Sequence, residues 1–123
     1  MSNIPSNADF ARADELDRER SRNLDAASRN VAEHFQEVCR LFKVHILPQR
    51  DVSFRAYIFF YTDENIRDSE RNGMLYAIQD YVYEELERQG RGKRGEISVA
   101  FEFDSDENVA ANYDGDYFLR LRN

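Results

Sequence analysis

The stretch VSFRAYIFFY, residues 52–61, constrains the fold more than any other part of the sequence. It is rich in β-branched and aromatic side chains, which favour a strand. Alternate side chains of a strand face opposite ways. One face then carries Phe54, Ala56, Ile58 and Phe60, and the other carries Arg55, Tyr57, Phe59 and Tyr61. Because both faces are largely apolar, the stretch predicts a central strand that is covered on both sides or partly exposed at a binding face.

Helical spacing of apolar residues predicts two main helices. The first runs over residues 24–47 and is ended by Pro48, because the residue before a proline avoids helical geometry. Its apolar face carries Leu24, Ala27, Val31, Phe35, Val38, Phe42 and Ile46. The second runs over residues 70–89, with Ser69 and Asn72 as capping candidates and Gly90 as its stop.

Two further strands complete the expected fold. Residues 96–103 alternate between apolar and polar side chains, residues 104–108 read as a polar turn, and residues 116–122 read as a short final strand. The sequence therefore predicts an α+β fold, with a small, mainly antiparallel sheet and two main helices packed on one face. The central residues of these patterns are the expected core: Phe35, Val38, Phe42, Ile58, Phe60, Ile78, Val82, Val99 and Phe101.

The chain length indicates one domain. Residues 1–23 are polar and form an extension that is partly helical or disordered, and residues 24–123 form a single α+β domain. The single cysteine, Cys39, cannot form an internal disulfide, which fits a reducing compartment. No stretch approaches the roughly 18 apolar residues of a membrane helix. Since the beginning of the chain also lacks the pattern of a signal peptide, we expect a cytoplasmic protein.

The residues that carry chemistry do not form a recognisable catalytic or metal-binding pattern. Both histidines, His34 and His45, fall in the first predicted helix, about three turns apart. Residues 104–108 resemble the start of a calcium loop, but Val109 and Gly115 stand where such a loop needs glycine and glutamate. We therefore expect no enzyme, no bound metal and no cofactor.

The charge of the chain is unevenly distributed. The net charge is −7, and residues 95–119 contain seven acidic residues and no basic one. Direct binding of nucleic acid needs a basic surface, so this balance favours a basic protein partner instead. Tyrosines among the acids add contact area of the kind found at interface hot spots. The predicted partner-binding residues are Glu102, Asp104, Asp106, Glu107, Tyr113, Asp114, Asp116 and Tyr117.

In these traits the chain resembles the immunity proteins of bacterial polymorphic toxins and contact-dependent inhibition systems. The resemblance is to the class: a small acidic α+β chain with EISVAFEF and NYDGDYFLRLR as its closing segments. It implies stoichiometric binding of one cognate toxin or nuclease domain, with its active site or an essential surface blocked.

Other functions remain open at this point. One is a phage-encoded nuclease antagonist, such as an anti-CRISPR protein or a DNA mimic, which would need carboxylates spread over a long surface. Another is an adaptor that forms homodimers through its aromatic strand; the sequence does not set the oligomeric state. If the acidic segment is not the interface, the first helix or the face with Tyr57, Phe59 and Tyr61 is the next candidate.

Overall fold

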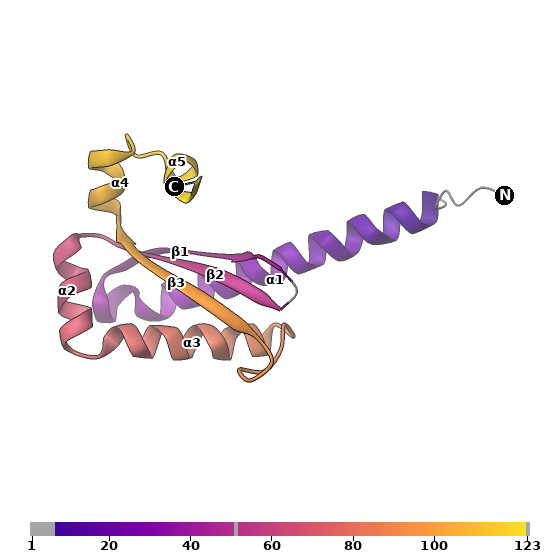
Figure 1. The fold of residues 1–123 in the computed structure, drawn as a ribbon, viewed down its shortest axis with the longest axis horizontal. Coiled ribbons are helices and arrows are strands. Elements are labelled where there is room, and N and C mark those ends of the chain that lie inside the picture. The colour runs from indigo at the N-terminus through magenta and orange to yellow at the C-terminus, as the bar shows by residue number, and fades with distance from the viewer. Residues whose placement is uncertain (1–6, 51, 123) are drawn as a thin grey trace.

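The computed structural model describes residues 7–50 and 52–122, apart from the side chains of residues 7–17, 19 and 20. These residues form a three-stranded sheet and five helices, and the predicted α+β class is confirmed (Figure 1). The elements in chain order are α1 (Asn7–Cys39), β1 (Leu41–Pro48), β2 (Ser53–Phe60), α2 (Asp63–Arg71), α3 (Met74–Arg88), β3 (Ser98–Ser105), α4 (Asp106–Asn112) and α5 (Tyr117–Arg122).

The sheet has the order β1-β2-β3, so the predicted central strand is confirmed. β1 is antiparallel to β2, whereas β3 is parallel to it. The sheet is therefore mixed, where the sequence predicted a mainly antiparallel one. The parallel pair arises because α2 and α3 return the chain from the end of β2 to its beginning before β3 starts.

Both faces of β2 are covered, as its apolar pattern predicts. On one face, α1 and α3 pack on the sheet and form the main core, confirming that two main helices share a face (Figure 1). On the other face, Tyr57 and Phe59 pack with Val109 of α4 and with Tyr117 and Leu121 of α5. The second face is thus covered by the short helices of the acidic segment, which the sequence did not predict.

Of the first predicted helix, residues 24–47, the part up to Cys39 is confirmed as the second half of α1. Leu24, Ala27, Val31 and Phe35 are buried at helical spacing. The helix begins at Asn7, so the expected boundary between residues 23 and 24 lies inside a continuous element. Its amino-terminal half extends beyond the sheet (Figure 1). Residues 1–6 of the predicted extension lie outside the described residues.

The prediction of helix for residues 41–47 is wrong, because this segment is strand β1. Arg40 adopts a left-handed backbone (φ 60°) and ends α1. An irregularity in the pairing between Leu41 and Lys43 lets Leu41 and Val44, three residues apart, both face the core, which imitates helical spacing. Phe42, a predicted core residue, is consequently 37% exposed; Val38, in the last turn of α1, is also exposed, at 63%.

The remaining predicted core residues lie in or against the main core. Phe35, Ile58, Phe60, Ile78 and Val82 are buried, and Val99 and Phe101 are partly buried and pack against them.

The second predicted helix, residues 70–89, is confirmed as α3 from Met74 to Arg88, but its first residues belong to a separate helix, α2, and Asn72 and Gly73 lie between the two. The sequence did not predict the helix α2 over residues 63–69, and Ser69 is buried in that helix rather than capping α3. Gly73 takes the left-handed conformation (φ 79°) that separates the helices. α3 ends at Arg88, with Gly90 (φ 76°) just beyond it as predicted.

The end of the chain also differs from the prediction. Strand β3 extends through Ser105, so the expected turn over residues 104–108 is wrong. The expected strand over residues 116–122 is helix α5. A helix allows Tyr117 and Leu121, four residues apart, to face the sheet together, and Arg120 points the same way. Tertiary contact with β2 therefore decides the conformation of this short segment.

Candidate protein-binding surface

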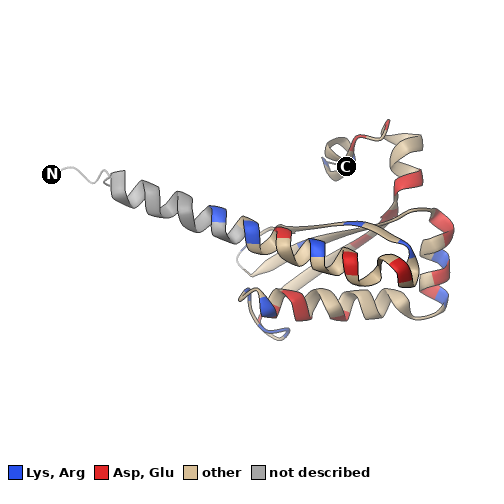
Figure 2. Cartoon of the chain, turned by 180° about the vertical axis from the view of Figure 1, so that it is seen from behind, with Lys and Arg blue, Asp and Glu red and all other residues tan. Residues whose placement is uncertain are grey.

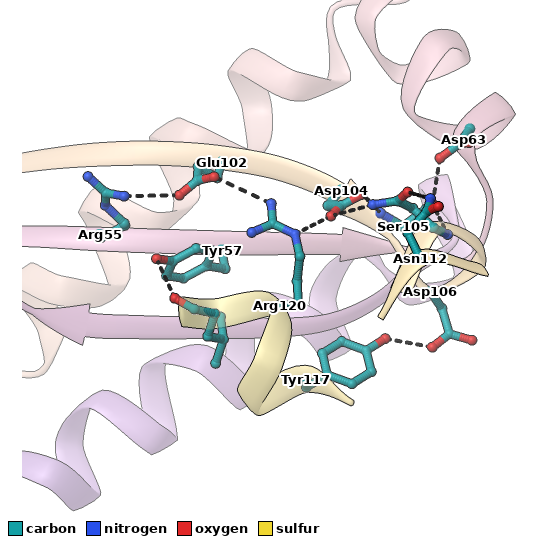
Figure 3. Close-up of polar contacts among 12 residues, drawn as sticks. Arg55, Tyr57, Asp63, Glu102, Asp104, Ser105, Asp106, Asn112, Tyr117 and Arg120 are labelled. Carbon is teal, nitrogen blue, oxygen red and sulfur yellow. Dashed lines mark hydrogen bonds and ion pairs between the residues drawn. The ribbon is translucent and has the colours of Figure 1, made fainter. Parts of the chain in front are cut away.

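The acidic segment forms a network of polar contacts on the second face of the sheet (Figure 3). Arg120 of α5 pairs with Asp104, and its Nη2 lies 3.4 Å from Oε1 of Glu102. Arg55 of β2 reaches the other oxygen of Glu102 at 3.1 Å. Two bases from distant parts of the chain therefore neutralise two of the acids that were predicted to face a partner.

Asp104 is a structural residue. Only 9% of it is exposed, and it accepts hydrogen bonds from Nδ2 of Asn108 at 3.0 Å and from the backbone N–H of Ser105 at 2.8 Å. Burial by itself would lower the pKa of Arg120, but the hydrogen bonds and charges of Asp104 and Glu102 raise it overall. The expectation that Asp104 is a surface turn residue is wrong. Removing its charge would disturb the attachment of α5.

Asp106 and Tyr117 form a second link between the two short helices. The hydroxyl of Tyr117 donates to Oδ1 of Asp106 at 2.6 Å, and its ring packs on Phe59 at 4.9 Å. Burial and then the carboxylate of Asp106 raise the pKa of Tyr117, so the phenol stays protonated and remains a donor. Tyr113 is half-buried against the same apolar cluster.

Three of the predicted acids are left for solvent. Glu107, Asp114 and Asp116 are exposed, while Glu102 and Asp106 are half-buried. The structure thus brings the eight predicted residues together on β3, α4, α5 and the loop between those helices, but it divides them by role. Asp104, Asp106 and Tyr117 hold the segment in place, and the three exposed acids remain as predicted partner contacts.

A repeated motif that sequence reasoning missed places further acids beside these. Residues 60–66 read FYTDENI and residues 103–109 read FDSDENV. In both, a hydroxyl residue at the end of a strand caps the next helix: Thr62 accepts from the N–H of Asn65 at 3.2 Å, and Ser105 from that of Asn108 at 3.0 Å. A search of the sequence for the shared pattern F-x-[ST]-D-E-N would have found it.

Because β2 and β3 are parallel neighbours, the two capped helices start at the same end of the sheet. Phe60 lies opposite Ser105, and the hydroxyl of Ser105 donates to Asp63 in the first turn of α2. Acidic residues therefore gather at the starts of α2 and α4 at this end of the molecule, although α2 also carries Arg67 and Arg71 further along (Figure 2).

An exposed aromatic pair lies at the same end. The rings of Phe42 and Tyr61 are 4.9 Å apart, and 37% and 39% of these residues are exposed. The backbone N–H of Tyr61 donates to the carbonyl of Arg40 at 3.2 Å, and its carbonyl accepts from the N–H of Glu107 at 3.1 Å. We call the area around this pair the sheet-end surface; it comprises Glu37, Val38, Arg40, Phe42, Tyr61, Asp63, Glu64, Asp106 and Glu107.

A shallow cleft of about 510 Å³ opens beside Tyr61. It is lined by Gln36, Glu37, Arg40, Tyr61, Thr62 and Asn65. The cleft therefore lies between the end of α1 and the start of α2, next to the aromatic pair.

The residues considered for catalysis lie apart in the structure. His34 stacks on Tyr81 of α3 at 4.1 Å, whereas His45 lies on β1 and contacts Phe59 on the opposite face of the sheet. The expectation that both lie on one helix is wrong. Among the residues whose side chains the structure describes, no group of three or more His, Cys, Asp or Glu residues is arranged to hold a metal ion.

Comparison with known proteins does not assign the chain to a family. No protein-family model, no curated protein and no solved structure matches the chain. Among the described helices, including the 33-residue α1, none has an apolar stretch long enough to cross a bilayer.

Proposed function

We propose that this chain is a protein inhibitor of the immunity type, which binds a basic toxin or nuclease domain in a one-to-one complex and blocks it. The observation that carries the proposal is the platform formed by α4, α5 and the loop between them. This platform exposes Glu107, Asp114 and Asp116, while the buried ion pair at Asp104 and the half-buried hydrogen bond between Asp106 and Tyr117 hold it in place.

A fixed acidic platform suits this role for two reasons. Acidic surfaces attract a basic partner over distance and raise the association rate. A surface that is already ordered loses little conformational entropy on binding, so more of the interaction energy appears as affinity. Arg120 of α5, only 8% exposed, supplies that order by pairing with Asp104 on β3.

The direct test is co-expression. Toxin genes of these systems stand beside their inhibitors, so the candidate partner is the product of the reading frame adjacent to this gene. We expect that product to arrest growth alone, growth to recover when this chain is co-expressed, and the two proteins to purify as a one-to-one complex. An adjacent product that is harmless, or that remains toxic in the presence of the chain, would reject the proposal.

The role of the platform is tested by the kinetics of that complex. The variant E107Q/D114N/D116N removes three charges while preserving side-chain shape, and asparagine tolerates the left-handed backbone of Asp114 (φ 52°). We expect association to slow several-fold at low salt and the difference to shrink as salt shortens the Debye length below about 8 Å. The matched control is E33Q/E70Q/E87Q, which removes three exposed acids from α1, α2 and α3.

A further inference from the structure

The aromatic pair of the sheet-end surface, Phe42 and Tyr61, lies outside both core clusters and is partly exposed to solvent. Each of the two residues is more than one-third exposed. Val38, at the end of α1 and 63% exposed, adds apolar area at the same end of the sheet. Aromatic side chains are enriched at protein interfaces, and tyrosine is among the residues that most often form their hot spots.

The pair is also held in position. Tyr61 is fixed through both backbone groups, by Arg40 on one side and Glu107 on the other. Phe42 contacts Tyr61 and lies 6.4 Å from the ring of Tyr117, which the Asp106 hydrogen bond anchors. Phe42 is therefore held on strand β1, and Tyr61 is held at the end of β2 beside the starts of α2 and α4.

The charge around the pair indicates the chemistry of the partner. Five carboxylates lie on the elements next to it: Glu37 near the end of α1, Asp63 and Glu64 at the start of α2, and Asp106 and Glu107 at the start of α4. The bases on the same segments include Arg40, Lys43 and Arg67, and two of the acids, Asp63 and Asp106, already accept hydrogen bonds from Ser105 and Tyr117. Lys43 is turned onto the ring of Tyr117, with its Nζ 4.7 Å from the ring centre. A guanidinium or ammonium group approaching this surface would meet carboxylates and the faces of two aromatic rings, both of which attract cations.

We infer that the sheet-end surface is the anchor of the interface and receives a segment of the basic partner in which arginine or lysine side chains flank an apolar one. The apolar side chain packs on Phe42 and Tyr61, and the basic side chains meet the surrounding carboxylates. This inference rests on the proposed function and names the surface and partner chemistry that serve it.

Two other occupants fit the surface less well. A second copy of the chain would bring the same acidic surfaces face to face, which is repulsive. Nucleic acid would be repelled by the carboxylates for the same reason.

The test uses a peptide probe, so that it does not depend on the toxin. A hexapeptide of alternating arginine and leucine is titrated into the labelled full chain and followed by amide chemical shifts. We expect the shifts to centre on Phe42, Tyr61, Glu64 and Glu107, and a peptide of alternating aspartate and leucine to cause none. F42S/Y61S should weaken binding of the basic peptide at least tenfold, while Y76S, which removes a 73% exposed tyrosine from α3, should not.

The outcomes separate this inference from the proposed function. If F42S/Y61S does not fold as wild type by circular dichroism, E64Q/E107Q replaces it, with the same expected loss of peptide binding. Shifts centred elsewhere, no binding, or binding unchanged in the variants would overturn the inference. If the toxin complex forms with an unchanged dissociation rate in F42S/Y61S, the inference fails and the proposed function stands. If no toxin is neutralised but the peptide binds at Tyr61, the proposed function fails and the peptide-binding surface stands.

Discussion

Replacing Arg120 by methionine tests whether the buried ion pair holds the acidic platform on the sheet. Arg120 and Asp104 are 8% and 9% exposed, and the substitution leaves the carboxylate of Asp104 buried without its cation. Breaking a buried pair in this way costs about 3–5 kcal/mol. Asp104 retains hydrogen bonds from Asn108 and from the N–H of Ser105, so we expect the lower end, about 3 kcal/mol.

The lost stability would appear first as local unfolding of α5, because this helix has six residues and few side chains attach it to the sheet. We therefore expect amide hydrogen exchange of residues 117–122 to accelerate strongly in R120M, while the amides of β2 keep their protection. Arg122 lies on the same helix but is exposed, so R122M is the matched control and should change the unfolding free energy by less than about 0.5 kcal/mol.

The measurement is urea unfolding followed by circular dichroism, with hydrogen exchange on the same samples. The double variant D104N/R120M also removes the unpaired carboxylate, so we expect it to recover part of the stability that R120M loses. If R120M is as stable as R122M and the exchange of residues 117–122 is unchanged, the pair does not hold α5 and the reasoning is refuted.

Three further predictions address the rest of the fold. Phe59→Ala should lower the unfolding free energy by about 3–5 kcal/mol, because the ring is fully buried. The control Phe118→Ala, at a 79% exposed position, should have little effect, and similar losses in the two variants would contradict the packing of the second face. Burial and then the charge of Lys43 lower the pKa of His45 below its usual 6.5, against the opposing effect of Asp25. The unfolded chain therefore binds the proton more readily, so the unfolding free energy should fall as pH drops from 6.5 through the folded-state pKa of His45. His45→Gln should flatten the dependence of the unfolding free energy on pH, whereas the control His34→Gln should not. An unchanged dependence in His45→Gln would exclude His45 as its source. Burial also raises the pKa of Cys39, so iodoacetamide at pH 8 should label the native thiol at least about tenfold more slowly than the urea-unfolded one. Equal labelling rates would show that the thiol of Cys39 is accessible in the folded protein.

The strongest local patterns were predictable from the sequence. The ten residues 52–61 have two apolar faces, and such a strand is stable only where both faces are covered, which sets β2 at the centre of the sheet. The stripe from Leu24 to Phe35 repeats at helical spacing over several turns, and a pattern of that length fits no other regular element. The acidic excess of residues 95–119 is likewise a property of the sequence alone.

The short segments were decided by their tertiary partners. Residues 41–47 have apolar side chains at spacings that fit a helix as well as a strand with an irregular pairing, and hydrogen bonding to β2 selects the strand. Residues 117–122 alternate well enough for a strand, but the helix brings Tyr117, Arg120 and Leu121 onto the face of β2 together. In segments of this length the local preferences differ by less than the energy of the contacts that each conformation makes.

The same distinction applies to the candidate binding surface. The sequence determines how many carboxylates the acidic segment contains, but not which of them face solvent. That depends on Arg55 and Arg120, which lie 47 and 18 residues from Glu102 in the chain and meet it only across the folded sheet. A charge is available to a partner only when no buried cation has already paired with it, and in this protein the pairing is set by the folding of α5 onto β2.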